Sequence, residues 1–521
     1  MSTIIFRKLC FGYSGIDLFT NLDLVLDTHW RTALVGRNGR GKTTLLRLIA
    51  GELHPEKGSL TRDCNPRLFH RTQNSPSDAT SESLFNVVLD GIAPYRAWEA
   101  RMDSLLQQNS DAALKAYAEI QEDYVHHGGY EIRAQLEKEL TRVGLPSSLW
   151  QRRFASLSGG ERTRAKTASL FAANNSFALI DEPTNHLDLK GRQQLAEYLC
   201  SQSGFLLASH DRQLLGHTTN HVLALNRSNV SLEKGSYVQW RERFLQKQLS
   251  ERAINEQLKA QIGDLERSAR QRRRGAEKKE AEKAPHTDKG FIGHRAARQM
   301  RRARALERRV ESNIAERKTL LTNSEKRRAL RLRPAVRRKI LIQLSGLTLQ
   351  QSNRTLLENF DLQLESEERV AILGSNGCGK STLLNELSRI TPPSVRFTRG
   401  YQTPLWAVGS LRQCLAERKY DEARFCQVLG VLGVPGAVLD QPMETLSQGQ
   451  LKKIDLTRSF LDPVDFLIWD EPLNYLDIEA REQVETVILK DRPTLIFVEH
   501  DEAFISQVAT RTVNLEDWVP K

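Results

Sequence analysis

The sequence contains no long apolar run and little cysteine. Its mean hydropathy is −0.48, and it lacks any stretch of about 18 consecutive apolar residues, so no membrane-spanning helix is predicted. The start, MSTIIFRKLCFGY, has no charged segment followed by a long apolar one, and we expect no signal peptide. The six cysteines form no CxxC pair, which argues against a zinc site and a disulfide framework. This cysteine usage favours a reducing cytoplasm.

Positive charge is concentrated in one segment. Residues 241–340 contain 31 Lys and Arg against 13 Asp and Glu, a net charge of +18, whereas the remaining residues contain 45 and 51, a net charge of −6. The most basic stretch is QRRRGAEKKEAEKAPHTDKGFIGHRAARQMRRARALERR at 271–309. A basic segment between two mildly acidic parts points to a polyanionic partner.

The two acidic parts are copies of one pattern. GRNGRGKTT (36–44) returns as GSNGCGKST (374–382), LSGGE (157–161) as LSQGQ (446–450), DEPTNHLD (181–188) as DEPLNYLD (470–477), and SHD (209–211) as EHD (499–501). The offset falls from 338 to 289 between the first and second of these motifs, so the first half carries an extra piece. We expect it at about 90–130 and expect it to be helical, because that region is rich in alanine with spaced apolar residues.

Each half contains a phosphate-binding loop of the form GxxxxGK[ST], placed between a strand-like and a helical run. In such loops glycines let backbone N–H groups approach phosphate oxygens, and the helix dipole favours the anion. Lys42 and Lys380 are predicted to reach the β- and γ-phosphates, and Thr43 and Ser381 to ligate Mg²⁺. The predicted nucleotide contacts of the two loops are Gly36, Asn38, Gly39, Arg40, Gly41, Lys42, Thr43 and Thr44, and Gly374, Asn376, Gly377, Cys378, Gly379, Lys380, Ser381 and Thr382.

An acidic pair ends an apolar strand in each half, SFALID at 176–181 and DFLIWD at 465–470. Asp181 and Asp470 suit a role on Mg²⁺, and the glutamates that follow, Glu182 and Glu471, can polarise the attacking water. The alternative is that these acids only cap the strand ends; their duplication beside a phosphate loop favours catalysis. His210 and His500 follow the next apolar strands. A lone histidine there is usually structural, but as a repeated pair they fit contacts to the γ-phosphate.

Together these motifs resemble the ATP-binding cassette superfamily, over nearly all of 1–240 and 341–521. LSGGE is the signature of that superfamily. The resemblance implies an α/β fold with two P-loop cassette domains in tandem, ATP and Mg²⁺ as cofactors, and head-to-tail sites. Each ATP would meet the P-loop of one half and the signature of the other. Lys42 would then face Ser447 and Gly449, and Lys380 would face Ser158, Gly159 and Gly160.

The resemblance also assigns residues outside the main motifs. Gln73 and Gln402 match the Q-loop, which contacts nucleotide and Mg²⁺; Asp188 and Asp477 match the D-loop; Tyr13 matches the aromatic residue that stacks on adenine. The second half departs from the pattern at three positions. Gln351 replaces the stacking aromatic, Gln448 replaces a signature glycine, and Glu499 replaces the serine of SHD. We therefore expect two unequal ATP sites.

The insert between the cassettes, 241–340, reads as two long helices folded into an antiparallel hairpin. Apolar residues recur at rough helical spacing on both sides of APHTDKGFIG (284–293), which contains Pro285, Gly290 and Gly293 as breakers. An arm of about 40 residues would extend roughly 60 Å. Basic residues gather near the bend and suit phosphate backbones, while rings suit unpaired bases. The predicted RNA contacts are Lys283, His286, Lys289, Phe291, His294, Arg295, Arg298, Arg301 and Arg302. The alternative is a solvated spacer, which would mix its charges more evenly.

Two cassettes joined by a basic insert, with EPTNHLD in the first, resemble the ABC-F proteins. That resemblance implies an ATP hydrolase that binds the ribosome at the tRNA exit site, with its linker probing the P-site tRNA and the peptidyl transferase centre of 23S rRNA. It also implies contacts with nearby large-subunit proteins. IWDEPLNYLD, FVEHD and DKGFIGHRAARQMRRA resemble the antibiotic-resistance branch, which protects ribosomes from drugs. The chain is expected to be cytoplasmic, without a membrane partner, and monomeric, its two cassettes forming an intramolecular dimer.

Three other functions remain open on the sequence alone. The first is a housekeeping translation factor that rescues stalled ribosomes without drug protection. The second is the ATPase subunit of a transporter, which predicts a membrane partner and no role for 271–304. The third is a DNA-maintenance ATPase, whose partner would survive RNase treatment.

Overall fold

The structure is a computed structural model that describes residues 2–13, 16–69, 81–108, 110–173, 175–185, 187–226, 230–281, 340–351, 354–401 and 408–520. The chain divides into two compact units, one formed by Met1–Val238 with Ala329–Lys521, and one formed by Gln239–Arg328. The first unit contains both halves of the sequence repeat. The predicted boundaries 1–240, 241–340 and 341–521 stay a prediction.

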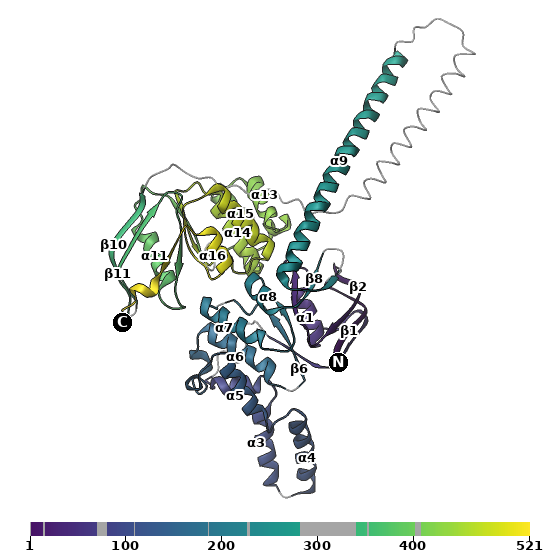
Figure 1. Ribbon diagram of the computed structural model, residues 1–521, viewed down its shortest axis with the longest axis vertical. Helices are drawn as coiled ribbons and strands as arrows, with labels where there is room; N and C mark the ends of the chain where they lie inside the picture. The colour runs from purple at the N-terminus through teal and green to yellow at the C-terminus, as the bar shows by residue number, and fades with distance from the viewer. Residues whose placement is uncertain are drawn as a thin grey trace, which may run out of the picture. The chain divides into compact units, whose positions relative to one another are not determined.

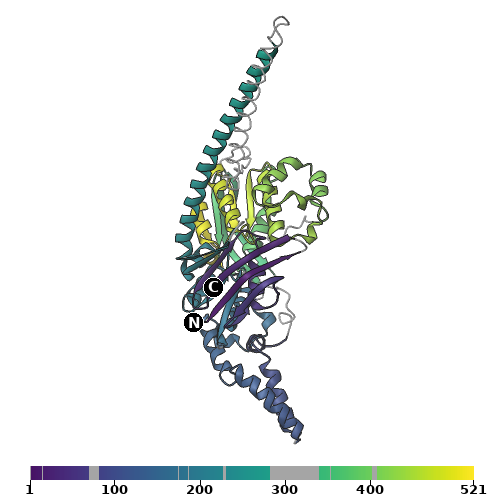
Figure 2. The same cartoon turned by 90° about the vertical axis from the view of Figure 1, so that its right-hand side faces the viewer.

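In the described part of the first half, six strands form one sheet in the order β5-β6-β7-β3-β8-β9. They are β3 (Arg31–Gly36), β5 (Asn65–Leu68), β6 (Ser176–Asp181), β7 (Phe205–Ala208), β8 (His221–Leu225) and β9 (Val230–Lys234). Neighbours pair in parallel except β8 with β9. A separate antiparallel sheet orders β2 (Ile16–Asp27), β1 (Thr3–Tyr13) and β4 (Lys57–Arg62); its long strands are purple in Figure 2.

Four helices of the first half begin at the repeated motifs. They are α1 (Lys42–Ala50), α6 (Gly159–Ala172), α7 (Leu189–Cys200) and α8 (Arg212–Thr218). Four more helices lie between β5 and α6 in the sequence. They are α2 (Leu84–Asp90), α3 (Tyr95–Leu106), α4 (Asp111–His126) and α5 (Ile132–Arg142). Helices α3 and α4 lie side by side (Figure 1). They share an edge-on aromatic cluster of Tyr95, Trp98 and Tyr124. Both fall in the segment where the sequence predicts an extra helical piece.

The second half repeats this arrangement. Its described parallel strands have the order β13-β14-β15-β12-β16, with β12 (Arg369–Leu373), β13 (Phe397–Gly400), β14 (Phe466–Asp470), β15 (Leu495–Val498) and β16 (Arg511–Asn514). Strands β10 (Ile340–Gln351) and β11 (Arg354–Glu365) pair antiparallel. The helices are α11 (Lys380–Ile390), α12 (Leu411–Glu417), α13 (Glu422–Val431), α14 (Gln448–Leu461), α15 (Ile478–Asp491) and α16 (Glu502–Val508). The predicted α/β fold with tandem P-loop cassettes is confirmed.

Both faces of each parallel sheet are covered, which explains the unbroken apolar runs of the central strands. In the second half, α11 packs on one face with Leu383, Leu384 and Leu387, against Ile468 and Val498. The other face receives a cluster drawn from α14, α15 and α16 that contains Phe460, Val484, Ile488, Phe504 and Val508. Full burial of such side chains contributes about 1.5–3 kcal/mol each relative to exposure. The carboxyl ends of the parallel strands therefore lie at one fixed edge, where the motifs follow them.

The described part of the second unit is one continuous helix, α9 (Tyr237–Ala281), of 45 residues, whose first two residues belong to the first unit (Figure 1). At 1.5 Å per residue, this helix is about 67 Å long. All nine predicted RNA contacts, and the bend of the predicted hairpin, lie outside the described residues. Among the described helices, none has the length and hydrophobicity needed to cross a bilayer.

Candidate ATP sites

The first phosphate loop connects β3 to α1. Lys42 is buried, and its Nζ donates to the Gly36 carbonyl at 2.7 Å and lies 3.4 Å from the Arg37 carbonyl. Burial lowers the pKa of this amine, while Glu182, Asp477 and Asp181 act in the opposite direction. Gly41 caps α1 at φ 87°, a left-handed conformation that glycine adopts without strain. The loop thus surrounds the Lys42 ammonium group with its own backbone carbonyl oxygens.

The second loop, between β12 and α11, repeats this geometry. Lys380 Nζ donates to the carbonyls of Gly374 at 2.8 Å and Ser375 at 2.9 Å. Gly379 caps α11 at φ 104°, as Gly41 caps α1. Both loops therefore present a lysine and a helix N-terminus at the carboxyl edge of a parallel sheet, an arrangement suited to polyphosphate.

The predicted Mg²⁺ ligands meet at the strand ends. Thr43 Oγ1 donates to Asp181 Oδ2 at 2.7 Å, linking α1 to β6. In the second half, Asp470 Oδ1 is buried and accepts no hydrogen bond from the described residues. A buried carboxylate oxygen without a donor is costly unless a cation balances it. Hydroxyl and carboxylate oxygens are the ligands that Mg²⁺ prefers, so these residues fit that ion.

In the first site the candidate base and the switch histidine bind each other. Glu182 has φ 50°, and its N–H donates to the Ala208 carbonyl at 2.8 Å. Its Oε2 accepts the His210 backbone N–H at 3.2 Å, and its Oε1 lies 3.3 Å from His210 Nε2. His210 Nε2 is also 3.1 Å from Asn38 Oδ1. Because both neighbours of Nε2 are oxygens, the geometry favours the tautomer that carries hydrogen on Nε2.

The second site has the same backbone with different side-chain partners. Glu471 has φ 48°, and its N–H donates to the Val498 carbonyl at 3.0 Å. Its Oε2 accepts a hydrogen bond from Asn474 Nδ2, and its Oε1 is 3.7 Å from His500 Nε2. The sequence motifs gave no signal for this role of Asn474.

Burial and like charge perturb both titratable groups of the second site. Burial, with the charges of Glu499 and Asp470, raises the pKa of Glu471 to about 7. Burial, reinforced by Lys380, lowers the pKa of His500 to about 3. The imidazole is therefore neutral at physiological pH. A carboxyl group with such a raised pKa is a functional-site candidate.

The D-loop aspartates bridge a helix start and a phosphate loop of the other half. Asp188 caps α7 through Oδ1, which accepts the Gly191 N–H, while its Oδ2 accepts the Asn376 N–H at 3.4 Å. Asp477 caps α15 and accepts the Asn38 N–H at 3.4 Å through Oδ2, to which Lys453 also donates at 3.1 Å. Each loop asparagine is thus contacted across the repeat.

The signature serines begin helices. Ser158 accepts the Glu161 N–H at 3.2 Å, and Glu161 accepts the Ser158 N–H at 2.8 Å. Ser447 and Gln450 form the equivalent capping box at the start of α14. A Cβ added to Gly449 would lie 3.6 Å from Asn38 Nδ2, and Asn38 donates to the Tyr475 carbonyl at 3.1 Å. The signature of the second half therefore lies beside the first phosphate loop.

The structure describes only some of the remaining predicted nucleotide contacts. Tyr13 is 46% exposed, and its ring makes a T-shaped contact with the ring of Phe11. Gln351, which replaces it in the second half, accepts a hydrogen bond from Thr382 Oγ1 at 3.4 Å. Gln73 and Gln402 lie outside the described residues. The functional roles of all these residues stay predictions.

Two parallel-sheet domains, each with a phosphate loop, a strand-end acid and a signature helix, define tandem P-loop nucleotide-binding domains. Residues 19–185 and 357–474 match the ABC transporter family. The chain belongs to that family, whose domains bind ATP.

Several curated relatives span nearly the whole chain. "ATP-binding protein Uup" of Escherichia coli is 27% identical over 100% of this chain and 80% of its own. "Tylosin resistance ATP-binding protein TlrC" of Streptomyces fradiae is 28% identical over 97% of this chain and 96% of its own length. "Energy-dependent translational throttle protein EttA" of Haemophilus influenzae is 27% identical over 94% of this chain and 87% of its own length. These relatives are ABC-F proteins. A solved "RNase-L Inhibitor" shares the fold, with a TM-score of 0.58 at 17% identity over 98% of this chain and 88% of that one.

Proposed function

We propose that this protein is an ATP-dependent ribosome-binding factor of the ABC-F type. The observation that carries the proposal is the combination of two candidate ATP sites with a +18 insert between them. ATP binding would join the two cassettes, and hydrolysis would separate them. This cycle would control a basic arm that contacts ribosomal RNA and tRNA.

The hydrolysis step follows from the contacts at each site. Lys42 and Lys380 would hold the β- and γ-phosphates, since their ammonium groups lie within the phosphate loops, against the carbonyls of Gly36 and Gly374. Glu182 and Glu471 would orient and polarise the attacking water, and His210 and His500 would contact the γ-phosphate. Thr43 with Asp181, and Ser381 with Asp470, would hold Mg²⁺, with Gln73 and Gln402; the ion neutralises phosphate charge.

The ribosomal end of the proposal is supported by charge and by relatives. Lys and Arg side chains that neutralise RNA phosphates give an affinity that falls steeply as the salt concentration rises. A basic hairpin would supply such contacts. The predicted contacts Lys283 to Arg302 lie between the cassettes in sequence, and relatives are named for translational throttling and for tylosin resistance. We place the arm at the tRNA exit site, near P-site tRNA and the peptidyl transferase centre, in the cytoplasm.

Within this class, we propose ribosome protection against a drug. The relative named for tylosin resistance covers nearly the whole chain, and FVEHD resembles the antibiotic-resistance branch. The relative named as a translational throttle favours a second candidate, a housekeeping factor that acts on stalled ribosomes. A deletion strain separates the two, since only drug protection predicts hypersensitivity to a ribosome-targeting antibiotic.

The test of ribosome binding is sedimentation of a hydrolysis-deficient variant. Glu182→Gln/Glu471→Gln protein in lysate with ATP should sediment with 70S ribosomes, because ATP is bound but not cleaved. Changing Lys283, Lys289, Arg295, Arg298, Arg301 and Arg302 to Gln should return it to the top of the gradient. The matched control removes six exposed charges from the cassettes, at Lys138, Arg152, Arg153, Lys190, Lys419 and Lys490, and should still sediment. Protein that stays at the top with its arm intact would contradict the proposal.

A further inference from the structure

The two ATP sites differ at the residue before the switch histidine. Ser209 and Glu499 occupy this position, at the end of β7 and β15. Ser209 Oγ accepts the Asp211 N–H at 3.1 Å and so completes the turn into α8. The His210 N–H is thereby left to Glu182, which accepts it at 3.2 Å. The first site thus joins its candidate base directly to its switch.

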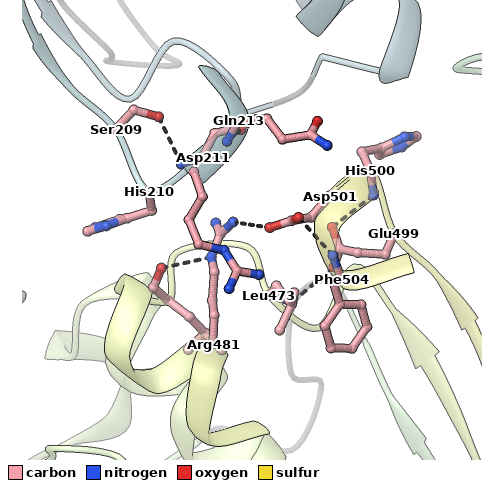
Figure 3. A network of polar contacts seen from close by, with 12 residues as sticks. Ser209, His210, Asp211, Gln213, Leu473, Arg481, Glu499, His500, Asp501 and Phe504 are labelled. Carbon is pink, nitrogen blue, oxygen red and sulfur yellow. Dashed lines mark hydrogen bonds and ion pairs between the residues drawn. The ribbon is translucent and has the colours of Figure 1, made fainter. Parts of the chain in front are cut away.

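Glu499 takes that hydrogen bond in the second site. Its carboxylate is fully buried, and each oxygen accepts a backbone N–H, Oε1 from His500 at 2.9 Å and Oε2 from Leu473 at 3.1 Å. Figure 3 shows Glu499 between these two segments, whereas Ser209 turns toward Asp211. Glu499 therefore ties the switch to the loop that follows Glu471.

The displaced catalytic candidate has a different partner. Glu471 Oε2 is bound by Asn474, and its Oε1 stays 3.7 Å from the His500 ring, beyond hydrogen-bond length. In the first site the equivalent amide, Asn185 Nδ2, has no hydrogen-bond partner among the described residues. The exchange of serine for glutamate thus accompanies a change of partner for the backbone N–H of the switch histidine, the carboxylate of the candidate base and the asparagine amide. The same segments also differ at Thr184 and Leu473.

We propose that Glu499 is a positioning residue that makes ATP cleavage at the second site slower than at the first, by taking the switch N–H that would otherwise hold Glu471. The proposal rests on the proposed ATPase function and names how its two sites differ. Cleavage requires a base held within hydrogen-bond reach of the attacking water. Glu182 has that restraint from His210. Glu471 is instead held toward Asn474, so the second site requires a rearrangement before cleavage.

The experiment measures one site at a time in the full-length protein. Glu182→Gln silences the first site, and Glu499→Ser is then added to give the second site the residue of the first. The second-site kcat should rise by about three- to tenfold, a small part of the roughly 10²–10⁴ that a positioned base contributes. KM should stay within about twofold, because the phosphate-loop contacts are untouched. Glu499→Gln should keep kcat within about twofold of its parent, since its amide oxygen can still accept the His500 N–H, although its NH2 group cannot replace Oε2 as the acceptor of the Leu473 N–H.

Matched variants separate positioning from a structural effect. In a Glu471→Gln background, which reports the first site, Glu499→Ser should leave kcat within about twofold, and Ser209→Glu should lower it by about three- to tenfold. The reverse exchange also keeps the proposal testable if Glu499→Ser fails to fold. An unchanged second-site kcat, or an equal change at both sites, would overturn this inference alone. Absence of ATP hydrolysis by the wild-type protein would overturn the proposed ATPase as well.

Discussion

A buried ion pair beside the second switch should contribute strongly to the stability of that half. Arg481 of α15 donates to Asp501 Oδ2 at 3.1 Å, and the two side chains are only 5% and 3% exposed (Figure 3). Asp501 also caps α16, since its Oδ1 accepts the Phe504 N–H at 3.1 Å. The same carboxylate thus balances a buried guanidinium and starts a helix.

The expected losses follow from separating these two roles. Asp501→Asn keeps a cap but leaves Arg481 charged, buried and unpaired, which should cost about 3–5 kcal/mol. Asp501→Ala should cost about 1 kcal/mol more, because the cap is lost as well. Arg481→Met/Asp501→Asn leaves no unpaired charge and should recover most of the loss. It leaves the Leu476 carbonyl without the Arg481 Nε donor at 3.2 Å, a residual cost of about 1 kcal/mol.

Hydrogen exchange of peptides from β14 and β15 measures this without assuming that the whole chain unfolds at once. A loss of about 3 kcal/mol should speed their exchange on the order of 10²-fold. The matched control is Asp211→Asn in the first half. Arg192 and Asp211 pair there at 3.1 Å, but their side chains are more exposed, at 11% and 9%. Asp211→Asn should therefore speed hydrogen exchange less, and only in peptides from β6 and β7. The reasoning is refuted if the double variant exchanges as fast as Asp501→Asn, because unpaired charge would then not be the cause.

Two further predictions concern the same half. Burial opposes ionisation of Asp501 and Asp477, but Arg481 and Lys453 lower the pKa of each respectively, and a carboxylate with a lowered pKa stabilises the fold above about pH 4. Thermal stability should therefore fall as pH drops below about 4, and less steeply in Asp501→Asn. Gly379→Ala should cost about 1–2 kcal/mol, since φ is 104° and the new Cβ would lie 3.3 Å from Leu356 Cβ, and should weaken binding of a fluorescent ATP analogue. Gly430→Ala, in α13 with open space, should instead raise stability by about 0.5–1 kcal/mol without affecting binding.

Much of the fold was predictable because its determinants are local and repeated. Apolar runs ending in Asp181 and Asp470 read as buried strands, and they are β6 and β14. The glycine-rich loops read as strand-to-helix turns, and they connect β3 to α1 and β12 to α11. The partners of Asp188 and Asp477 were not predictable. Each aspartate meets an asparagine 188 or 439 residues away in sequence, which only the tertiary fold brings together.

The side-chain exchange at Glu499 shows why the sequence predicted that the two sites differ but not which hydrogen bonds change between them. The backbones of Glu182 and Glu471 agree, with φ of 50° and 48° and matching hydrogen bonds to Ala208 and Val498. A parallel sheet fixes these main-chain positions whatever side chains follow the strands. The hydrogen bonds of the side chains are then free to be reassigned by one substitution, provided every buried donor still finds an acceptor. Glu499 meets that condition for two N–H groups, so the second half could diverge in catalysis while keeping the fold of the first.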